Sequence, residues 1–355
     1  MSESDSIVAE TAARIFADLA DPQTINAAKD EAWKAPLWKA LEENGLSLAW
    51  VADDLGGAGA ELSDGFEVIS VAGRYAAPVP IAETLLAGWL LAQARIASPE
   101  GMMTVAPMRP TDRITLGADG TLSGRARGIP YMRDAAHLAV VAHGPQGVSV
   151  ALVRSTSVRM TEMRGIAGNT VYEVAFDKTK PVRVADAPSG FSQETLMLMG
   201  AAVRSLSSAG ALAAILDVSV RYAGERVAFE RTISKFQAVQ HNLARLAGES
   251  AAANAVATSA ADAIARAESL LDPGVYLEVA SARIRSAEAA TEGSAIAHQV
   301  HGAIGFTKEH ILHRFTRALL TWRDDFGNES RWAVELGNRV AAAGADELWP
   351  LLASR

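Results

Sequence analysis

The sequence predicts an α+β protein in which helical N- and C-terminal regions flank a small antiparallel β domain. Alanine content changes sharply along the chain, with 28 Ala in residues 201–300 and only 12 in residues 101–200. A single proline, Pro273, lies between Ser189 and Trp349. Long helices can run through such a stretch, because each proline would remove a backbone donor and clash with the preceding turn. The C-terminal region is therefore expected to be a bundle of long helices.

The middle of the chain is rich in short β-branched runs that are separated by turn residues. These runs predict strands over His137–Ala142, Val148–Val153 and Thr170–Phe176. Gly144–Gly147 separates the first two strands. Asp119-Gly120 marks another hairpin, because Asp and Gly tolerate the positive φ of a tight turn. This region is therefore expected to be a small antiparallel β domain.

The N-terminal region returns to helical patterning. Its first clear helix lies within Ala35–Gly45, with Pro36 near the start and Gly45 just past the end. A second helix is expected over Ser63–Tyr75. Strands do not alternate with helices, which excludes a doubly wound nucleotide-binding sheet. The expected domains are N-terminal helical, middle β and C-terminal helical, over residues 1–105, 106–187 and 188–355.

Composition and charge exclude several classes of protein. A chain of 355 residues that is 49% hydrophobic can bury a sizeable core. Its formal charge of −8 argues against nucleic acid and anionic membranes as partners. No stretch approaches the ~18 uncharged apolar residues of a membrane span, and the absence of Cys removes disulfides and thiolate metal sites. The opening MSESDSIVAE lacks the features of a secretory signal, so we expect a cytoplasmic protein.

Two histidine pairs have a spacing that could suggest a metal site. His298 and His301, and likewise His310 and His313, are spaced to share one helix face. Glycines interrupt the segment between the pairs, and no thiolate is available to complete a zinc site. We therefore expect no metal.

Three stretches resemble the acyl-CoA dehydrogenase family, in that family's order. The first is Leu37–Leu46 followed by Leu55–Gly59, similar to the family's N-terminal helix and Gly-rich turn. The second is Arg226–Gln240, similar to the segment "R-x-x-F-G-x-x-I-x-x-F-Q". The third is His298–Thr307, similar to "Q-x-x-G-G-x-G-x" with Ala303 in place of the second Gly. The resemblance implies a helical domain, a β domain and a four-helix bundle.

In this family the second and third motifs bind flavin adenine dinucleotide (FAD) across a subunit boundary. The resemblance implies that six residues here contribute to such a site: Arg226, Phe229, Phe236, Gln237, Gln299 and Gly302. An arginine fork meets a pyrophosphate with paired, charge-assisted hydrogen bonds. A glycine lets the backbone approach the cofactor, and an amide both donates and accepts hydrogen bonds.

Two features of the family are missing. The acidic "T-E-P-x-x-G-S-D" segment near the flavin ring corresponds to Thr104–Asp112, which has no Gly-Ser-Asp and contains Arg109. Family members remove the α-proton of a CoA thioester with a Glu, either in "Y-E-G-T" or early in the long bundle helix. These positions align with Phe326 and about Gly200. Neither offers the desolvated carboxylate that this proton abstraction needs.

Asp325 and Glu329 lie beside the missing position and are the candidate catalytic bases. A shift of one residue turns a helical side chain by ~100°, so a neighbouring acid would point away from the position of the usual base. This favours an alternative without a catalytic role. In that alternative, Asp324 and Asp325 form ion pairs at a solvated surface. Their arginine partners would be Arg323 or Arg331.

The resemblance implies an enzyme that oxidises a CoA thioester to its 2,3-enoyl form and passes a hydride to FAD. This chain keeps the cross-subunit FAD motifs but lacks the usual catalytic base. In both respects it resembles the shorter subunit of bacterial heterotetrameric members of the family, some of which act in steroid side-chain breakdown. We therefore expect an acyl-CoA substrate, a second acyl-CoA dehydrogenase subunit as partner, and an electron-transfer flavoprotein as electron acceptor. Two alternatives remain: a self-sufficient homo-oligomer that uses Asp325 or Glu329, and a structural subunit without flavin.

Overall fold

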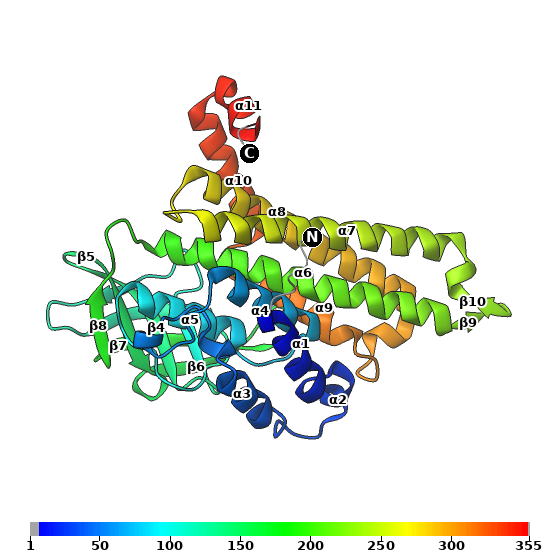
Figure 1. The fold of residues 1–355 in the computed structure, drawn as a ribbon, viewed down its shortest axis with the longest axis horizontal. Coiled ribbons are helices and arrows are strands. Elements are labelled where there is room, and N and C mark those ends of the chain that lie inside the picture. The colour runs from blue at the N-terminus through cyan, green and yellow to red at the C-terminus, as the bar shows by residue number, and fades with distance from the viewer. Residues whose placement is uncertain (1–6, 354–355) are drawn as a thin grey trace.

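The computed structural model describes residues 7–353, and their elements follow the expected order of helices, sheet and helix bundle (Figure 1). The N-terminal helices are α1 (Ile7–Leu19), α2 (Pro22–Ala27), α3 (Lys34–Glu43), α4 (Leu62–Tyr75) and α5 (Ile81–Gln93). Short 3₁₀ turns at Leu46–Leu48 and Asp53–Leu55 connect α3 to α4. Both helices expected in this region are confirmed, as α3 and α4. Gly45 follows α3 with a φ of 69°, the left-handed geometry that ends a helix.

An eight-stranded sheet follows in the sequence. Its strands are β1 (Met103–Ala106), β2 (Ile114–Leu116), β3 (Leu122–Ile129), β4 (His137–Gly144), β5 (Gly147–Arg154), β6 (Arg159–Arg164), β7 (Thr170–Thr179) and β8 (Arg183–Asp186). The strand order is β6-β7-β3-β2-β4-β5-β8, and β1 also pairs with β4. The three expected strands are confirmed as β4, β5 and β7. Gly144 pairs with Gly147 across the predicted tight turn.

The sheet is mainly antiparallel, as expected, but it also contains two parallel pairings. Both β1 and β2 pair with β4 in parallel, whereas the other pairings are antiparallel. Parallel neighbours need a long connection rather than a tight turn. The β2–β3 hairpin supplies that connection between β1 and β4. Local turn signals predict hairpins well, but they carry no information on which distant strand a chain returns to.

Long helices form the C-terminal region. They are α6 (Gln193–Glu225), α7 (Gln237–Arg266), α8 (Pro273–His301), α9 (Leu312–Trp322), α10 (Glu329–Ala343) and α11 (Ala345–Ala353). A small hairpin, β9 (Val227–Ala228) and β10 (Arg231–Thr232), joins α6 to α7, and a 3₁₀ segment over Gly302–Phe306 follows α8. Figure 1 shows α6, α7 and α8 side by side, with the sheet at one end and the β9–β10 hairpin at the other.

Helix α6 is the central element of the fold, because it packs against α4, α7, α8 and α9. It is long and apolar enough to cross a membrane by length and composition alone. However, 94% of its most apolar window is buried inside the protein, as in the core helix of a globular fold. Alanines such as Ala257 of α7 and Ala280 of α8 are fully buried. Their small side chains let the bundle helices approach closely, as the alanine content predicted.

Candidate functional site

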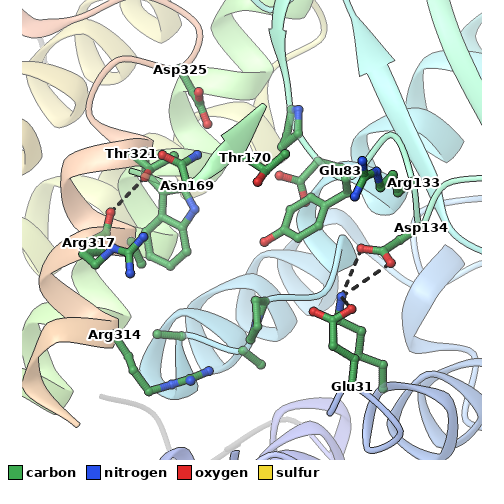
Figure 2. A pocket seen from close by; sticks show the side chains of 18 of the residues that line it. Glu31, Glu83, Arg133, Asp134, Asn169, Thr170, Arg314, Arg317, Thr321 and Asp325 are labelled. Atoms are coloured by element: carbon green, nitrogen blue, oxygen red, sulfur yellow. Dashed lines mark hydrogen bonds and ion pairs between the residues drawn. The ribbon is translucent and has the colours of Figure 1, made fainter. Parts of the chain in front are cut away.

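A cavity of about 450 Å³ lies where the three regions of the chain meet. The N-terminal helices contribute Lys34 and Glu83, and the middle region contributes Tyr131 from the β3–β4 connection and Thr170 of β7. The bundle contributes a face of α9 and the start of the loop that follows it. Figure 2 shows charged side chains pointing into this space from opposite walls. The volume is in the range of pockets that hold small organic molecules.

Arg204 of α6 joins two carboxylates at the wall of the cavity. Its NH2 group donates to Oε1 of Glu83 at 2.5 Å, and its Nε donates to Oδ2 of Asp325 at 2.9 Å. Both Arg204 and Glu83 are 2% exposed. Burial alone would lower the pKa of Arg204, but the attraction of Glu83 and Asp325 holds it above its ordinary value. The group is a buried cation shared by two anions.

Asp325 therefore differs from the surface ion pair considered above. Burial raises the pKa of Asp325 to about 6; Arg204 acts against this shift, and Glu83 reinforces it. Asp325 also lines the cavity, so its carboxyl faces a space that a ligand can enter. The surface interpretation holds for Asp324, which is 43% exposed with Oδ1 lying 3.8 Å from Nε of Arg323. Arg331, the other expected partner, pairs with Glu335 instead.

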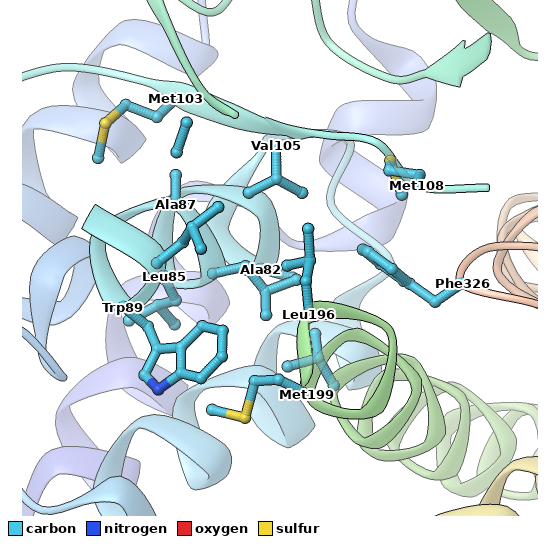
Figure 3. Packing of buried hydrophobic residues seen from close by; sticks show 14 of the residues in the cluster. Ala82, Leu85, Ala87, Trp89, Met103, Val105, Met108, Leu196, Met199 and Phe326 are labelled. Atoms are coloured by element: carbon cyan, nitrogen blue, oxygen red, sulfur yellow. The ribbon is translucent and has the colours of Figure 1, made fainter. Parts of the chain in front are cut away.

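An apolar side chain occupies the position that the family resemblance assigns to the base. Phe326 is fully buried, and Figure 3 shows it pointing toward Met108, Leu196 and Met199. Its backbone has a φ of 57°, so the chain reverses and directs Phe326 inward while Asp325 faces the cavity. A Cβ added at Gly200 would overlap with the Phe326 ring. The two aligned positions thus lie against each other, and neither carries an acid.

Glu329, the second candidate base, lies outside this arrangement. It is the first residue of α10, and its Oε2 is 4.0 Å from Nε of Arg323. Glu329 does not line the cavity. Of the two candidates, the geometry brings only Asp325 to a space open to a ligand.

Arg283 of α8 holds the loop that carries Asp325 and Phe326. The Arg283 side chain is fully buried and donates to the carbonyl oxygens of Trp322, the last residue of α9, and of three loop residues: Arg323, Asp325 and Gly327. Hydrogen bonds from a charged donor are roughly twice as strong as neutral ones. The loop is therefore fixed from behind by one guanidinium group.

The six residues expected at a cofactor lie at the hairpin end of the bundle. Arg226 caps α6, and Phe229 at the tip of the β9–β10 hairpin is 89% exposed with a φ of 54°. The Phe229 and Phe236 rings are 6.2 Å apart, and Gln237 is the exposed first residue of α7. The structure therefore brings these four residues together.

Gln299 and Gly302 lie at the C-terminal end of α8, and both are exposed. Their neighbour His301 stacks on Tyr222 of α6, with ring centroids 4.5 Å apart. Tyr222 is one turn before Arg226, so the third motif lies at the same end of the bundle as the second. Histidines that were considered as metal ligands pack against aromatic rings here, and the His301 and His310 ring centroids are 4.6 Å apart.

The stretch Thr104–Asp112, which replaces the family's acidic segment, borders a smaller cavity. This cavity, lined by Met108, Arg109 and Gly128 among others, has a volume of about 150 Å³. That is below the ~300–1,000 Å³ of typical ligand pockets. Asp112 is buried and accepts a hydrogen bond from Nε of Arg127 at 2.9 Å, so it stabilises the sheet.

Arg204 and Glu83 were not identified from the sequence. Each had a signal: Arg204 is a lone charge within Leu196–Gly210, and Glu83 is a lone acid within Pro78–Leu91. Charged residues inside apolar helices are rarely buried without a partner. Which charges pair could not be inferred, because Glu83 and Arg204 are 121 residues apart.

Comparison with known proteins agrees with this architecture. Residues 190–327 match the family model described as acyl-CoA dehydrogenase, C-terminal domain. The chain is 28% identical over 317 residues to acyl-CoA dehydrogenase IpdE2 of Mycobacterium tuberculosis, which covers 88% of this chain and 90% of that protein.

Two solved structures share the fold. One is the ChsE4-ChsE5 complex from Mycobacterium tuberculosis, with a TM-score of 0.83 and 22% identity over 96% of this chain and 99% of that chain. The other is the Tcur3481-Tcur3483 steroid ACAD G363A variant, with a TM-score of 0.81 and 23% identity over 95% of this chain and 98% of that chain. The fold is that of an acyl-CoA dehydrogenase. Residues 190–327 thus match the C-terminal domain of acyl-CoA dehydrogenases, and the chain as a whole is similar in sequence to acyl-CoA dehydrogenase IpdE2.

Proposed function

We propose that this chain is one subunit of a heteromeric acyl-CoA dehydrogenase. The β9–β10 end of its helix bundle contacts an FAD molecule that is bound mainly by a partner subunit. The observation that carries the proposal is Phe229, an aromatic side chain that is 89% exposed at the tip of the hairpin. Burying an aromatic ring of this size in another molecule is strongly favourable. Such exposure beside Arg226 and Gln237 suits a surface that another molecule covers.

The donor set at this end fits a dinucleotide. Within residues 7–353, no acid pairs with Arg226, so its guanidinium is available to a pyrophosphate. Phe229 offers a flat apolar face to an adenine, and the amides of Gln237 and Gln299 are exposed. Nothing lies within 4 Å of a Cβ added at Gly302, so a cofactor has open access to its backbone. When bound, the flavin supplies the acceptor for a hydride.

The region of this chain that corresponds to the family's flavin-ring site is poorly suited to catalysis, which supports a reaction centre in the partner subunit. The cavity beside Arg109 is about 150 Å³, and Phe326 fills the place of the usual base. We propose that the partner is a second acyl-CoA dehydrogenase chain that carries the catalytic carboxylate. Two-chain complexes with this fold, one of them named a steroid ACAD, support that choice and suggest a steroid or other bulky acyl-CoA as substrate. An electron-transfer flavoprotein in the cytoplasm would then accept the electrons.

The test is to purify the chain alone and together with an acyl-CoA dehydrogenase encoded beside it. We expect stoichiometric flavin and dye reduction only in the two-chain complex. Arg226→Ala is expected to lower the flavin content of that complex at least tenfold at limiting FAD, as expected for loss of a bidentate charged contact. Arg221→Ala, at an exposed position on the same helix, is the matched control and should retain flavin.

Two results would contradict the proposal. Full activity and stoichiometric flavin in the lone chain would show that no partner is needed. An unchanged flavin content in the Arg226→Ala complex would favour the structural subunit without flavin.

A second candidate function has its own supporting observation, the position and pKa of Asp325. A carboxyl with a pKa of about 6 at a cavity wall has the desolvated character of a general base. In this alternative the chain is a self-sufficient homo-oligomer, and Asp325 removes the α-proton of the thioester. Asp325→Asn would then lower kcat by ~10²–10⁴ with flavin retained, whereas Glu329→Gln would leave kcat unchanged.

A further inference from the structure

Two arginines face the cavity from α9. The apolar side of this helix is buried through Leu312, Phe315 and Leu319. The opposite side carries Arg314 and Arg317, three residues apart, and both line the cavity. Figure 2 shows them on one wall, across from Asp134 and Glu31. The helix therefore presents two guanidinium groups to the same space.

These arginines lack acidic partners among residues 7–353. Nε of Arg314 is shielded from solvent and has no hydrogen-bond partner. Burial lowers the pKa of Arg314, and no carboxylate counteracts that shift. Nε of Arg317 donates only to the carbonyl oxygen of Ala167, at 2.9 Å. Both groups thus retain donors for an anion.

The other cations of the cavity are already paired. Lys34 bridges Glu31 and Asp134, with Nζ–O distances of 2.9 and 3.2 Å. Arg204 is held by Glu83 and Asp325 as described above. Arg133 pairs with Glu162, at 2.6 Å. An incoming anion would therefore meet unpaired positive charge mainly on α9.

The charge of the lining indicates how much negative charge a ligand should bring. Five cations line the cavity: Lys34, Arg133, Arg204, Arg314 and Arg317. Four carboxylates line it: Glu31, Glu83, Asp134 and Asp325. With these arginines, lysine and carboxylates ionised, the lining itself carries one positive charge, and Glu162 outside the cavity offsets that of Arg133. The unpaired positive charge is therefore that of the two α9 arginines. A carboxylate monoanion adds less repulsion beside the four lining carboxylates than a phosphate dianion would.

We propose that the cavity binds a carboxylate through Arg314 and Arg317, either a small organic acid or the acidic end of a larger ligand. A carboxylate accepts two parallel hydrogen bonds from a guanidinium, a geometry that an ammonium group cannot match. The volume of about 450 Å³ accommodates a compact acid. This inference goes beyond the proposed function and does not rest on it, because binding here requires neither flavin nor a partner subunit.

The test uses the purified full chain and a matched pair of probes, cyclohexanecarboxylate and cyclohexanecarboxamide. The two have the same shape, but only the first is charged. Isothermal titration calorimetry at about pH 8, well above the carboxylate pKa, compares their affinities. We expect the acid to bind at least tenfold more tightly than the amide, as for a charge-assisted bidentate pair.

Variants assign the binding to α9. Arg314→Gln and Arg317→Gln are each expected to weaken binding of the acid at least tenfold and to leave the amide unaffected. Arg159→Gln is the matched control, because Arg159 is exposed on β6 and outside the cavity. Thermal melting of each variant verifies that it is folded.

The outcomes that would overturn the proposal are distinct from failure of the flavin hypothesis. Equal binding of acid and amide would show that charge is not recognised. Unchanged acid binding in both α9 variants would place the contact elsewhere. Tighter binding of inorganic phosphate than of the acid would show that the cavity recognises a phosphate group and not a carboxylate. Lack of flavin in the same preparation would bear only on the proposed function.

Discussion

The Phe326 ring lies directly against Gly200 of α6, so that no side-chain atom could be added at Gly200 without displacing the ring. Phe326 is fully buried among Met108, Leu196 and Met199 (Figure 3). The family resemblance aligns these two positions with the alternative locations of the carboxylate that abstracts a proton. Here an aromatic ring and a glycine meet at this place, and the packing between them stabilises the loop after α9.

Gly200→Ala should therefore destabilise the protein. The added methyl group would force the Phe326 ring to move within a dense core, which typically costs about 1–3 kcal/mol. Gly248→Ala is the control, because Gly248 lies within α7 and nothing is within 4 Å of an added Cβ. That substitution should instead stabilise by about 0.5–1 kcal/mol through helix propensity. Urea unfolding monitored by circular dichroism compares the two.

A second substitution tests the cause of the loss. Combining Gly200→Ala with Phe326→Leu reduces the bulk opposite the new methyl group. The free energy of unfolding of the double variant should therefore fall by less than the sum of the two single decreases. Additive losses, or a Gly200→Ala variant as stable as Gly248→Ala, would contradict the packing interpretation.

Local features of the fold could be predicted from the sequence, whereas contacts between distant segments could not. The β4–β5 hairpin was predictable because Gly144–Gly147 carries its own turn chemistry. The parallel pairing of β1 with β4 depends on how the sheet closes, which no local signal encodes. Asp325 was identified as a candidate from its position in a motif. Its environment was misjudged, because Arg204 reaches it from 121 residues away.

Asp325 should make stability fall as the pH rises. The folded protein holds its proton with a pKa of about 6, whereas the unfolded chain titrates near 3.9. Its contribution is therefore full below about pH 4 and is lost as the pH rises through 6, a change of roughly 2–3 kcal/mol. Asp325→Asn should lack this loss.

The measurement is the free energy of unfolding of both proteins from about pH 4 to pH 7. Burial lowers the pKa of His301 to about 4, which gives an opposing rise in stability over the same range. This contribution cancels in the difference between wild type and variant. Asp324→Asn, at a side chain that is 43% exposed, is the control. A pH-independent difference between wild type and Asp325→Asn would rule out a raised pKa.

Arg283→Leu should strongly destabilise the protein. It removes the guanidinium donor from the carbonyls of Trp322, Arg323, Asp325 and Gly327 inside the core. Losing a buried charged network of this kind typically costs about 3–5 kcal/mol. Arg245→Leu, which breaks an exposed pair with Glu292, should cost less than about 1 kcal/mol. Equal midpoints of urea unfolding for the two variants would contradict the assigned role of Arg283.

Phe229→Ser should separate association from folding. Because Phe229 is 89% exposed in the chain, its replacement should leave the unfolding free energy of the isolated chain within about 0.5 kcal/mol of wild type. If the hairpin contacts a cofactor and a partner, losing a buried aromatic ring should weaken the two-chain complex at least tenfold. Val334→Ala, at a position that is 62% exposed on α10, is the control. Sedimentation velocity measures the dissociation constants, and complexes of equal strength would show that the hairpin tip faces solvent in the assembly.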